Sequence, residues 1–211
     1  MELISYKKIG GGELIAIVLF TIGIVAAVFL IVPPAEGLGD LVRIIYFHVP
    51  TAWLAVIAFF TSAYHAARYL RRKDPSNDEL SARAVRIGFI CVLLSTISGA
   101  IFSKLTWGAY WNWDPRQTTI FVLILIYGAY LTLRAAVNDP KTRAKVSAVY
   151  SLMSVLTVPF LVFILPRMYF SLHPSPLINS DASLDMDRTM LMVLMAALVD
   201  ATWIFIRLMR R

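Results

Sequence analysis

The chain has 211 residues, of which 59% are hydrophobic and only 16% are charged. Soluble domains contain about 45–50% apolar and about 25% charged residues. A mean hydropathy of +0.71, with twelve Phe, nine Tyr and five Trp, leaves too little polar surface for a water-soluble fold and predicts a membrane protein. The single cysteine, Cys91, excludes an internal disulfide and every C-x-x-C motif for zinc or redox chemistry.

Six apolar stretches are long enough to cross a bilayer as helices, which takes about 20 residues each. In chain order they are 13–32, 51–70, 84–102, 119–137, 147–165 and 189–206. The first follows Lys7 and Lys8, as in a signal peptide, but its apolar core is too long and Pro33-Pro34 replaces the small residues of a cleavage site. We therefore expect an all-α protein in which residues 1–211 form one membrane domain, a bundle of six transmembrane helices.

The net charge of +7 does not indicate a nucleic-acid partner, because the basic residues fall between the apolar stretches. One set of loops and termini holds fifteen Lys and Arg, whereas the other set holds five. The positive-inside rule places both termini in the cytoplasm. The sequence thus predicts a multi-pass membrane protein whose outer loops are 33–50, 103–118 and 166–188.

Two of the three histidines, His48 and His173, fall in the first and third outer loops, close to predicted membrane boundaries. Pro50 and Pro174 follow them and stiffen the chain there. Two imidazoles at similar depth could ligate one metal from opposite sides, as the iron of a planar macrocycle requires. The alternative is a pair of interfacial histidines that bond to backbone and water.

The middle outer loop concentrates aromatic residues, since Trp107, Tyr110, Trp111, Trp113 and Asp114 lie within eight positions. If this segment is helical, one face of the helix carries four of them: Trp107, Tyr110, Trp111 and Asp114. We expect a short external helix whose indoles stack on a flat aromatic ligand and exclude water from it. The alternative is an ordinary aromatic belt at the membrane interface.

Four cations lie on the same side as the histidines: Arg43, Lys104, Arg116 and Arg167. Haem carries two propionates, which an arginine can bind in bidentate fashion. We favour Arg43 and Arg116, because they are closest in sequence to His48 and to the tryptophans, with Asp114 as a second polar group at the rim. The alternative for each cation is a snorkelling side chain.

The string Trp107-Gly-Ala-Tyr-Trp-Asn-Trp-Asp-Pro-Arg116 resembles the tryptophan-rich WWD signature of the haem-handling membrane proteins CcmC, CcmF and CcsA. Within this superfamily the length, the six spans and RIIYFHVPTAW at 43–53 resemble the CcmC family, the haem exporter protein C of cytochrome c biogenesis, over roughly residues 13–207. Two features depart from that family. Trp-Asp-Pro-Arg-Gln leans toward the Trp-Asp-Pro-Lys-Glu of CcsA and CcmF, and Met168-Tyr-Phe170 stands where tryptophans are frequent.

The resemblance implies that His48 and His173 are the axial ligands of a non-covalently bound haem b at the outer leaflet, above the tryptophan-rich segment. It also implies that the protein presents haem to a periplasmic chaperone like CcmE, beside the transporter subunits CcmA and CcmB and a small protein like CcmD. It implies no catalytic base, and hence no enzyme.

Two other functions stay open: a CcsA-like lyase component acting directly on apocytochrome c, and a haem channel. A b-type cytochrome needs histidine pairs inside the spans, where only His65 lies. The acid in the sixth span, Asp200, is expected to form a structural ion pair or hydrogen bond.

Overall fold

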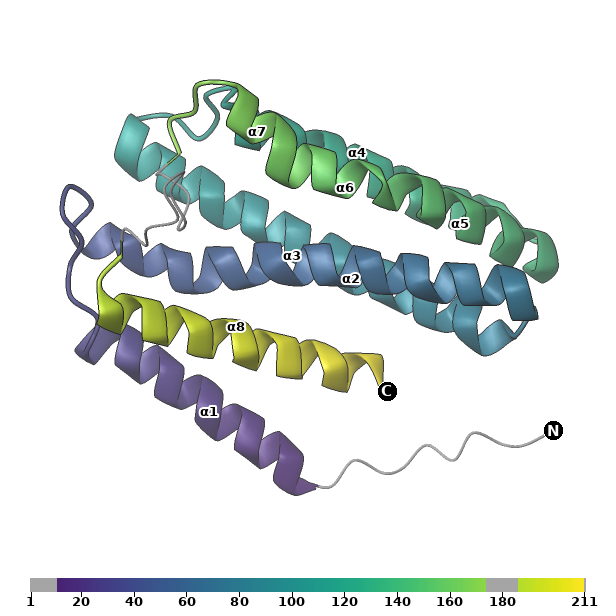
Figure 1. The fold of residues 1–211 in the computed structure, drawn as a ribbon, viewed down its shortest axis with the longest axis horizontal. Coiled ribbons are helices and arrows are strands. Elements are labelled where there is room, and N and C mark those ends of the chain that lie inside the picture. The colour runs from purple at the N-terminus through teal and green to yellow at the C-terminus, as the bar shows by residue number, and fades with distance from the viewer. Residues whose placement is uncertain (1–10, 174–185, 211) are drawn as a thin grey trace.

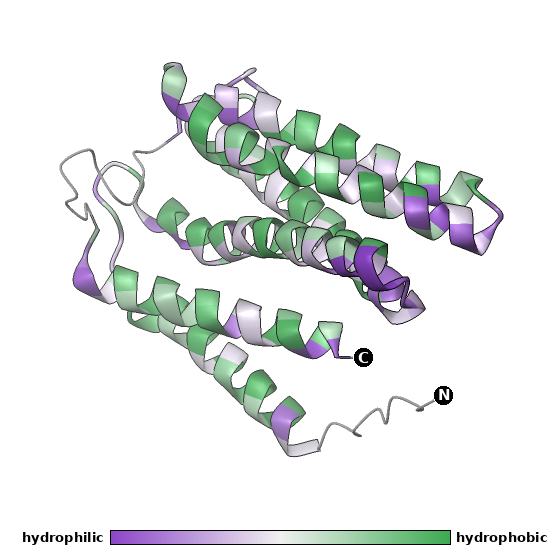
Figure 2. Cartoon of the chain, turned by 45° about the vertical axis from the view of Figure 1, so that its right-hand side comes forward, coloured by the Kyte–Doolittle hydropathy of each residue, from purple (hydrophilic) through white to green (hydrophobic). Residues whose placement is uncertain are grey.

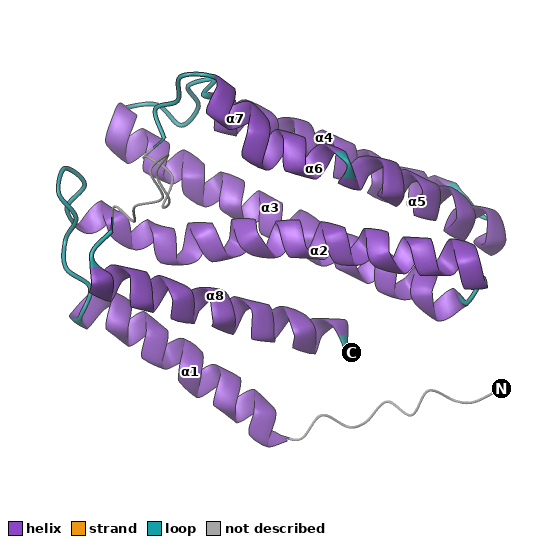
Figure 3. Ribbon diagram, viewed as in Figure 1, coloured by secondary structure: helices purple, strands orange, loops and turns teal. Residues whose placement is uncertain are grey.

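The computed structural model describes residues 11–173 and 186–210, and the regular structure in these ranges is helical (Figure 3). Pro174 lies outside the described residues. Within the described ranges six helical segments are long and apolar enough to cross a membrane, which confirms the predicted spans. They are α1 (Gly11–Leu30); α2 (Ile45–Arg72), preceded by the 3₁₀ turn η1 (Asp40–Ile44); α3 (Pro75–Trp107); α4 (Pro115–Ala136); a composite fifth span; and α8 (Arg188–Met209). The fifth span joins α5 (Pro140–Val155), α6 (Thr157–Pro159), the π-helix η2 (Phe160–Ile164) and α7 (Leu165–Met168).

Three of the helices begin with the same Asp-Pro pair. The side chains of Asp74, Asp114 and Asp139 accept hydrogen bonds from backbone N–H groups of the first turn, and a proline follows each of them. The carboxylate satisfies a donor that has no partner inside the helix, and the fixed φ of proline suits the first helical position. Hydrogen bonds from the Ser76 hydroxyl and backbone N–H hold the pKa of Asp74 below its ordinary value. The prolines at 75 and 140 are therefore the first residues of their helices.

The second span is the centre of the bundle. Helix α2 packs against α3, α5 and α8, while α1 lies at the edge, mainly on α8 (Figure 1). In the core Phe59 of α2 stacks on Tyr127 of α4, with ring centroids 3.5 Å apart and planes 8° from parallel. Hydrophobic residues cover the middle of the helices and hydrophilic ones gather toward their ends (Figure 2), as a bilayer requires.

The helices extend beyond the apolar stretches, so two expected loops are shorter than predicted. The second helix begins at Ile45 rather than at 51, which places His48 in its first turn and not in a loop. The loop expected at 103–118 shrinks to 108–114, because α3 continues to Trp107 and α4 begins at Pro115. Polar residues at helix ends are tolerated at the interface, so hydropathy alone locates these ends poorly.

The prediction of a helix in the tryptophan-rich segment is wrong, because residues 108–114 are not helical. Gly108 ends α3 with φ +83°, and Trp113 adopts φ +56°, so the chain leaves the right-handed helical region twice. Pro115 also disfavours helical backbone at Asp114. The face shared by Trp107, Tyr110, Trp111 and Asp114 on a continuous helix therefore does not form.

Candidate functional site

Three connections meet at one end of the bundle, opposite the end at which α8 finishes (Figure 1). They are the chain between α1 and α2, the 108–114 loop, and the segment after α7 that leads to His173. We call this end the histidine end, because it brings together the rings of His48 and His173. Their centroids are 6.3 Å apart and their planes are inclined by 41°.

This spacing is compatible with two axial ligands on one metal ion. A metal–imidazole bond is about 2.0–2.1 Å long, so two nitrogens on opposite sides of an ion lie roughly 4 Å apart. The ring centres lie farther out than the nitrogens, which brings their expected separation close to the observed 6.3 Å. The described residues contain no group of three or more His, Cys, Asp or Glu side chains that could hold a bare metal ion.

The hydrogen bonds of His48 select its tautomer. Ser98 of α3 donates its hydroxyl proton to the Ser95 carbonyl oxygen at 3.0 Å, so its oxygen is an acceptor toward His48. His48 Nδ1 lies 3.0 Å from that oxygen and must donate to it. The lone pair of the neutral imidazole is then on Nε2, the form in which histidine ligates a metal while its other nitrogen is held by a second group.

The ring of His48 lies directly against Gly99. A Cβ atom at position 99 would be 3.0 Å from His48 Cε1 and 3.5 Å from Nδ1, so any side chain there would push the ring. Ser98 and Gly99 together fix where the imidazole sits. Sequence reasoning did not identify either residue, because small residues in a transmembrane helix are common and carry no ligand signal.

Asp114 holds the segment that carries His173. Its side chain is only 5% exposed, and its carboxylate accepts hydrogen bonds from the Leu172 N–H at 2.7 Å and the Ser171 hydroxyl at 2.8 Å. The Ser171 oxygen in turn accepts the N–H of His173 at 3.2 Å. Asp114 also caps α4 through the Arg116 N–H at 2.9 Å. Sequence analysis placed Asp114 at the rim of a ligand, whereas the structure gives its carboxylate several protein donors.

The aromatic residues do not form one parallel slab. Trp111 meets Trp113 at 89° with centroids 5.9 Å apart, so only one of these two rings can lie flat on the same planar ligand in this arrangement. Trp107 packs edge-on against Phe102 at 5.6 Å. Tyr110 and Trp113 are 61% and 72% exposed. The segment therefore presents a broad, open aromatic surface.

A buried serine braces the 108–114 loop. Ser103 donates to the Ala109 carbonyl at 2.7 Å and accepts from the Asn112 side-chain amide at 2.7 Å. Gln117 accepts the Asn112 backbone N–H at 2.8 Å. These bonds satisfy backbone groups that a helix would otherwise have paired internally. Ser103, Asn112 and Gln117 were not singled out from the sequence, although Asn112 lies between Trp111 and Trp113.

The candidate cations differ in how fully they are engaged. Arg43 forms an ion pair with Asp40 at 2.9 Å and donates from Nε to the Val28 carbonyl at 3.1 Å. Arg116 has a buried Nε without a hydrogen-bond partner in the described part of the chain. The positive charge of Arg116 acts on His48, is repelled by the charge of Arg167 and is attracted by the carboxylate of Asp114. Among these residues Arg116 retains the clearest capacity for an anionic group.

Comparison with known proteins points to one family. The family model described as "Heme exporter protein C" matches residues 7–211. A protein of that name from Bradyrhizobium diazoefficiens is 28% identical over 81% of this chain and 64% of its own length, and one from Rhodobacter capsulatus is 33% identical over 59% and 52%. "Cytochrome c biogenesis protein CcsA" of Oenothera argillicola is 26% identical over 82% of this chain and 53% of its own length. The chain thus spans 52–64% of the length of these relatives.

Proposed function

Because the chain belongs to the haem exporter protein C family, which handles haem for cytochrome c maturation, we propose that its histidine end is a haem site. His48 and His173 supply the two axial nitrogens to a non-covalently held haem b. The observation that carries the proposal is their 6.3 Å separation, reached by two residues far apart in the sequence. Nδ1 of His48 is engaged by Ser98, so Nε2 is the nitrogen that would ligate the iron. Haem here is cargo, and six-coordinate iron offers no open position for oxygen chemistry.

The remaining candidate residues surround this pair. We assign the buried, unpartnered Nε of Arg116 to a haem propionate, with Arg43 as a second, already partly engaged cation. Trp107, Tyr110, Trp111 and Trp113 form the aromatic surface that shields the macrocycle from water, with one of Trp111 and Trp113 face-on. Asp114 contributes by holding the His173 segment.

We place this site at the outer face of the bacterial cytoplasmic membrane, because the loops at the opposite end carry most of the Lys and Arg residues. There the protein would present haem to a CcmE-like chaperone, beside CcmA, CcmB and a CcmD-like protein. Its contribution is to orient haem for a reaction in the partner, and it is not itself an enzyme.

The ligand assignment is tested by the visible spectrum of the purified protein after addition of haem. We expect His48→Ala and His173→Ala each to lose the six-coordinate spectrum. His65→Ala is the matched control, because His65 bonds Asn77 at 3.0 Å in the cytoplasmic half of α2 and should leave the spectrum unchanged. A double variant at 48 and 173 that kept the wild-type spectrum would refute the assignment.

A second function follows from the similarity to CcsA, which covers 82% of this chain. In that case the protein would deliver haem directly to apocytochrome c. Co-purification of the haem-loaded protein separates the two functions. Capture of a CcmE-like chaperone supports presentation, and capture of an apocytochrome with a C-x-x-C-H motif supports direct delivery.

A further inference from the structure

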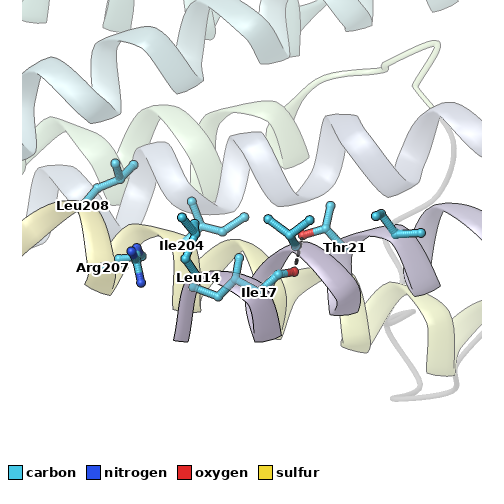
Figure 4. Close-up of a pocket in the computed structure, with 8 residues that line it drawn as sticks. Leu14, Ile17, Thr21, Ile204, Arg207 and Leu208 are labelled. Carbon is cyan, nitrogen blue, oxygen red and sulfur yellow. Dashed lines mark hydrogen bonds between the residues drawn. The ribbon is translucent and has the colours of Figure 1, made fainter. Parts of the chain in front are cut away.

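A groove of about 390 Å³ runs between α1 and α8, far from the histidines. Figure 4 shows Leu14, Ile17 and Thr21 following one another along α1, with Ile204, Arg207 and Leu208 of α8 beside them. The volume is within the range of about 300–1,000 Å³ that is usual for small-molecule sites. Most side chains that line the groove are apolar, and the guanidinium of Arg207 lies at one end of it.

The guanidinium of Arg207 is unusual, because it is buried without enough acceptors. The residue is 8% exposed, and neither Nε nor one terminal nitrogen, Nη1, has a hydrogen-bond partner among the described residues. Glu13 Oε2 lies 3.5 Å from Nη1, close enough to pair with the charge without receiving a hydrogen bond. Unfilled donors on a buried cation are costly unless an anionic acceptor completes them.

The local charge balance also calls for an anion. The single carboxylate of Glu13 is shared, since Arg210 lies 3.9 Å from it and the Trp203 indole donates to it at 3.2 Å. A third guanidinium is close, because Arg83 donates to the Met209 carbonyl at the end of α8. Arg207 and Arg210 therefore share the carboxylate of Glu13, while Arg83 bonds the backbone two residues after Arg207.

The other end of the groove reaches Thr21 and the buried Asp200 of α8, whose Oδ1 has no hydrogen-bond partner among the described residues. Thr21 donates to Asp200 Oδ2 at 2.7 Å, which fastens α1 to α8 and gives Asp200 the hydrogen bond expected from the sequence. Leu14 and Val18, which are 43% and 47% exposed, line the groove between this bond and Arg207, and Ile22, 59% exposed, lies next to Thr21. Leu14 and Ile22 are about 12 Å apart along α1 at 1.5 Å per residue. This surface faces the hydrocarbon of the bilayer if α1 spans it.

We propose that this groove binds an anionic phospholipid. The phosphate accepts hydrogen bonds from Arg207 at the end of α8, Arg210 adds attraction, and one acyl chain lies along α1 toward Thr21. A phospholipid supplies both required features, an anion at the interface and an apolar chain beneath it, and the bilayer is made of such molecules. The alternative occupant is a transmembrane helix of another protein, which would need an acidic residue at the depth of Arg207 to supply the anion.

The proposal is tested with the full-length protein in nanodiscs of equal phosphatidylglycerol and phosphatidylcholine, followed by native mass spectrometry of the retained lipid. We expect the wild type to retain phosphatidylglycerol preferentially, and Arg207→Gln to reduce that preference about tenfold or more. Arg72→Gln is the control: it removes an exposed arginine at the same end of the bundle and should leave the preference for phosphatidylglycerol unchanged.

A second variant leaves the charges intact. Val18→Trp fills the groove and should reduce retention of both lipids, so the proposal stays testable if Arg207→Gln fails to fold. Equal retention of the two lipids by the wild type, an unchanged preference in Arg207→Gln, or full retention in Val18→Trp would each overturn it. A photo-crosslinker at position 18 that captured a polypeptide instead of phospholipid in native membranes would do the same.

Discussion

The N–H of Leu172 donates a hydrogen bond to Asp114 Oδ2 at 2.7 Å, which joins the start of α4 to the segment that carries His173. The aspartate of the tryptophan-rich motif thereby reaches the second histidine through the backbone. From the sequence Asp114 was expected to contact the ligand, whereas in the structure it positions the segment that carries His173.

Replacing Asp114 should therefore weaken haem binding through His173. Asp114→Ala leaves the Leu172 N–H and the Ser171 hydroxyl without their acceptor, a change of about 1–3 kcal/mol in the stability of the segment. We expect weaker haem binding in a spectrophotometric titration and a spectrum in which one histidine is lost. Asp139→Ala is the control, because Asp139 is also an Asp-Pro helix cap but lies at the other end of the bundle. If Asp114→Ala and Asp139→Ala weakened haem binding equally, Asp114 would act only as a helix cap, and the prediction would be wrong.

Removing the Ser98 hydroxyl should alter the ligand field without removing a ligand. Ser98→Ala deprives Nδ1 of His48 of its acceptor, and such losses around metal-bound histidines typically weaken binding about 10–100-fold. The measurement is haem affinity together with the spectrum of the iron. Thr96→Val serves as control, since the Thr96 hydroxyl bonds only its own helix at the Val92 carbonyl among the described residues. Unchanged affinity in Ser98→Ala would contradict the tautomer argument.

A methyl group at Gly99 should displace the His48 ring. The added Cβ would lie 3.0 Å from Cε1, so Gly99→Ala must shift the imidazole and lower haem affinity. Gly128→Ala is matched to it, because the nearest atom to that Cβ is a Phe89 ring carbon at 3.7 Å, an ordinary contact. Both Gly→Ala changes favour the helix by about 1 kcal/mol in soluble hosts. A difference in haem affinity between the two variants therefore reflects the displacement of the His48 ring.

Arg116 should discriminate haem from its dimethyl ester, which lacks charged propionates. The wild type is expected to bind haem more tightly than the ester, and Arg116→Gln to lose about tenfold of that difference, the usual scale for a charged hydrogen bond. Arg43→Gln should lose less, because Asp40 and the Val28 carbonyl already engage Arg43. The measurement is a pair of titrations for each variant, and a larger loss in Arg43→Gln would reverse our assignment.

The sequence predicted the membrane class and the six spans well, because hydropathy is a property of the chain itself. It located the helix ends less well: His48 was expected in a loop and lies in the first turn of α2. The approach of His48 to His173 could only be suggested, since their separation depends on how α2, α4 and the segment after α7 pack together.

The tryptophan-rich segment shows why local pattern can mislead. Its i, i+3, i+4 and i+7 spacing fits a helical face, yet Gly108 and Pro115 bound the segment, and Trp113 takes a left-handed conformation. The bonds that stabilise this loop come from Ser103 and Gln117 in the neighbouring helices. Ser98 and Gly99 were missed for a related reason: they lie about 50 residues from His48 in the sequence and meet its ring only because α2 and α3 pack together.

The two histidines are held in different ways. His48 belongs to α2, and its ring bonds Ser98 and packs against Gly99. His173 follows a non-helical stretch that is hydrogen-bonded to the carboxylate of Asp114. If the two histidines hold haem as proposed, the helix fixes the position of His48, whereas the position of His173 depends in part on the hydrogen bonds to Asp114.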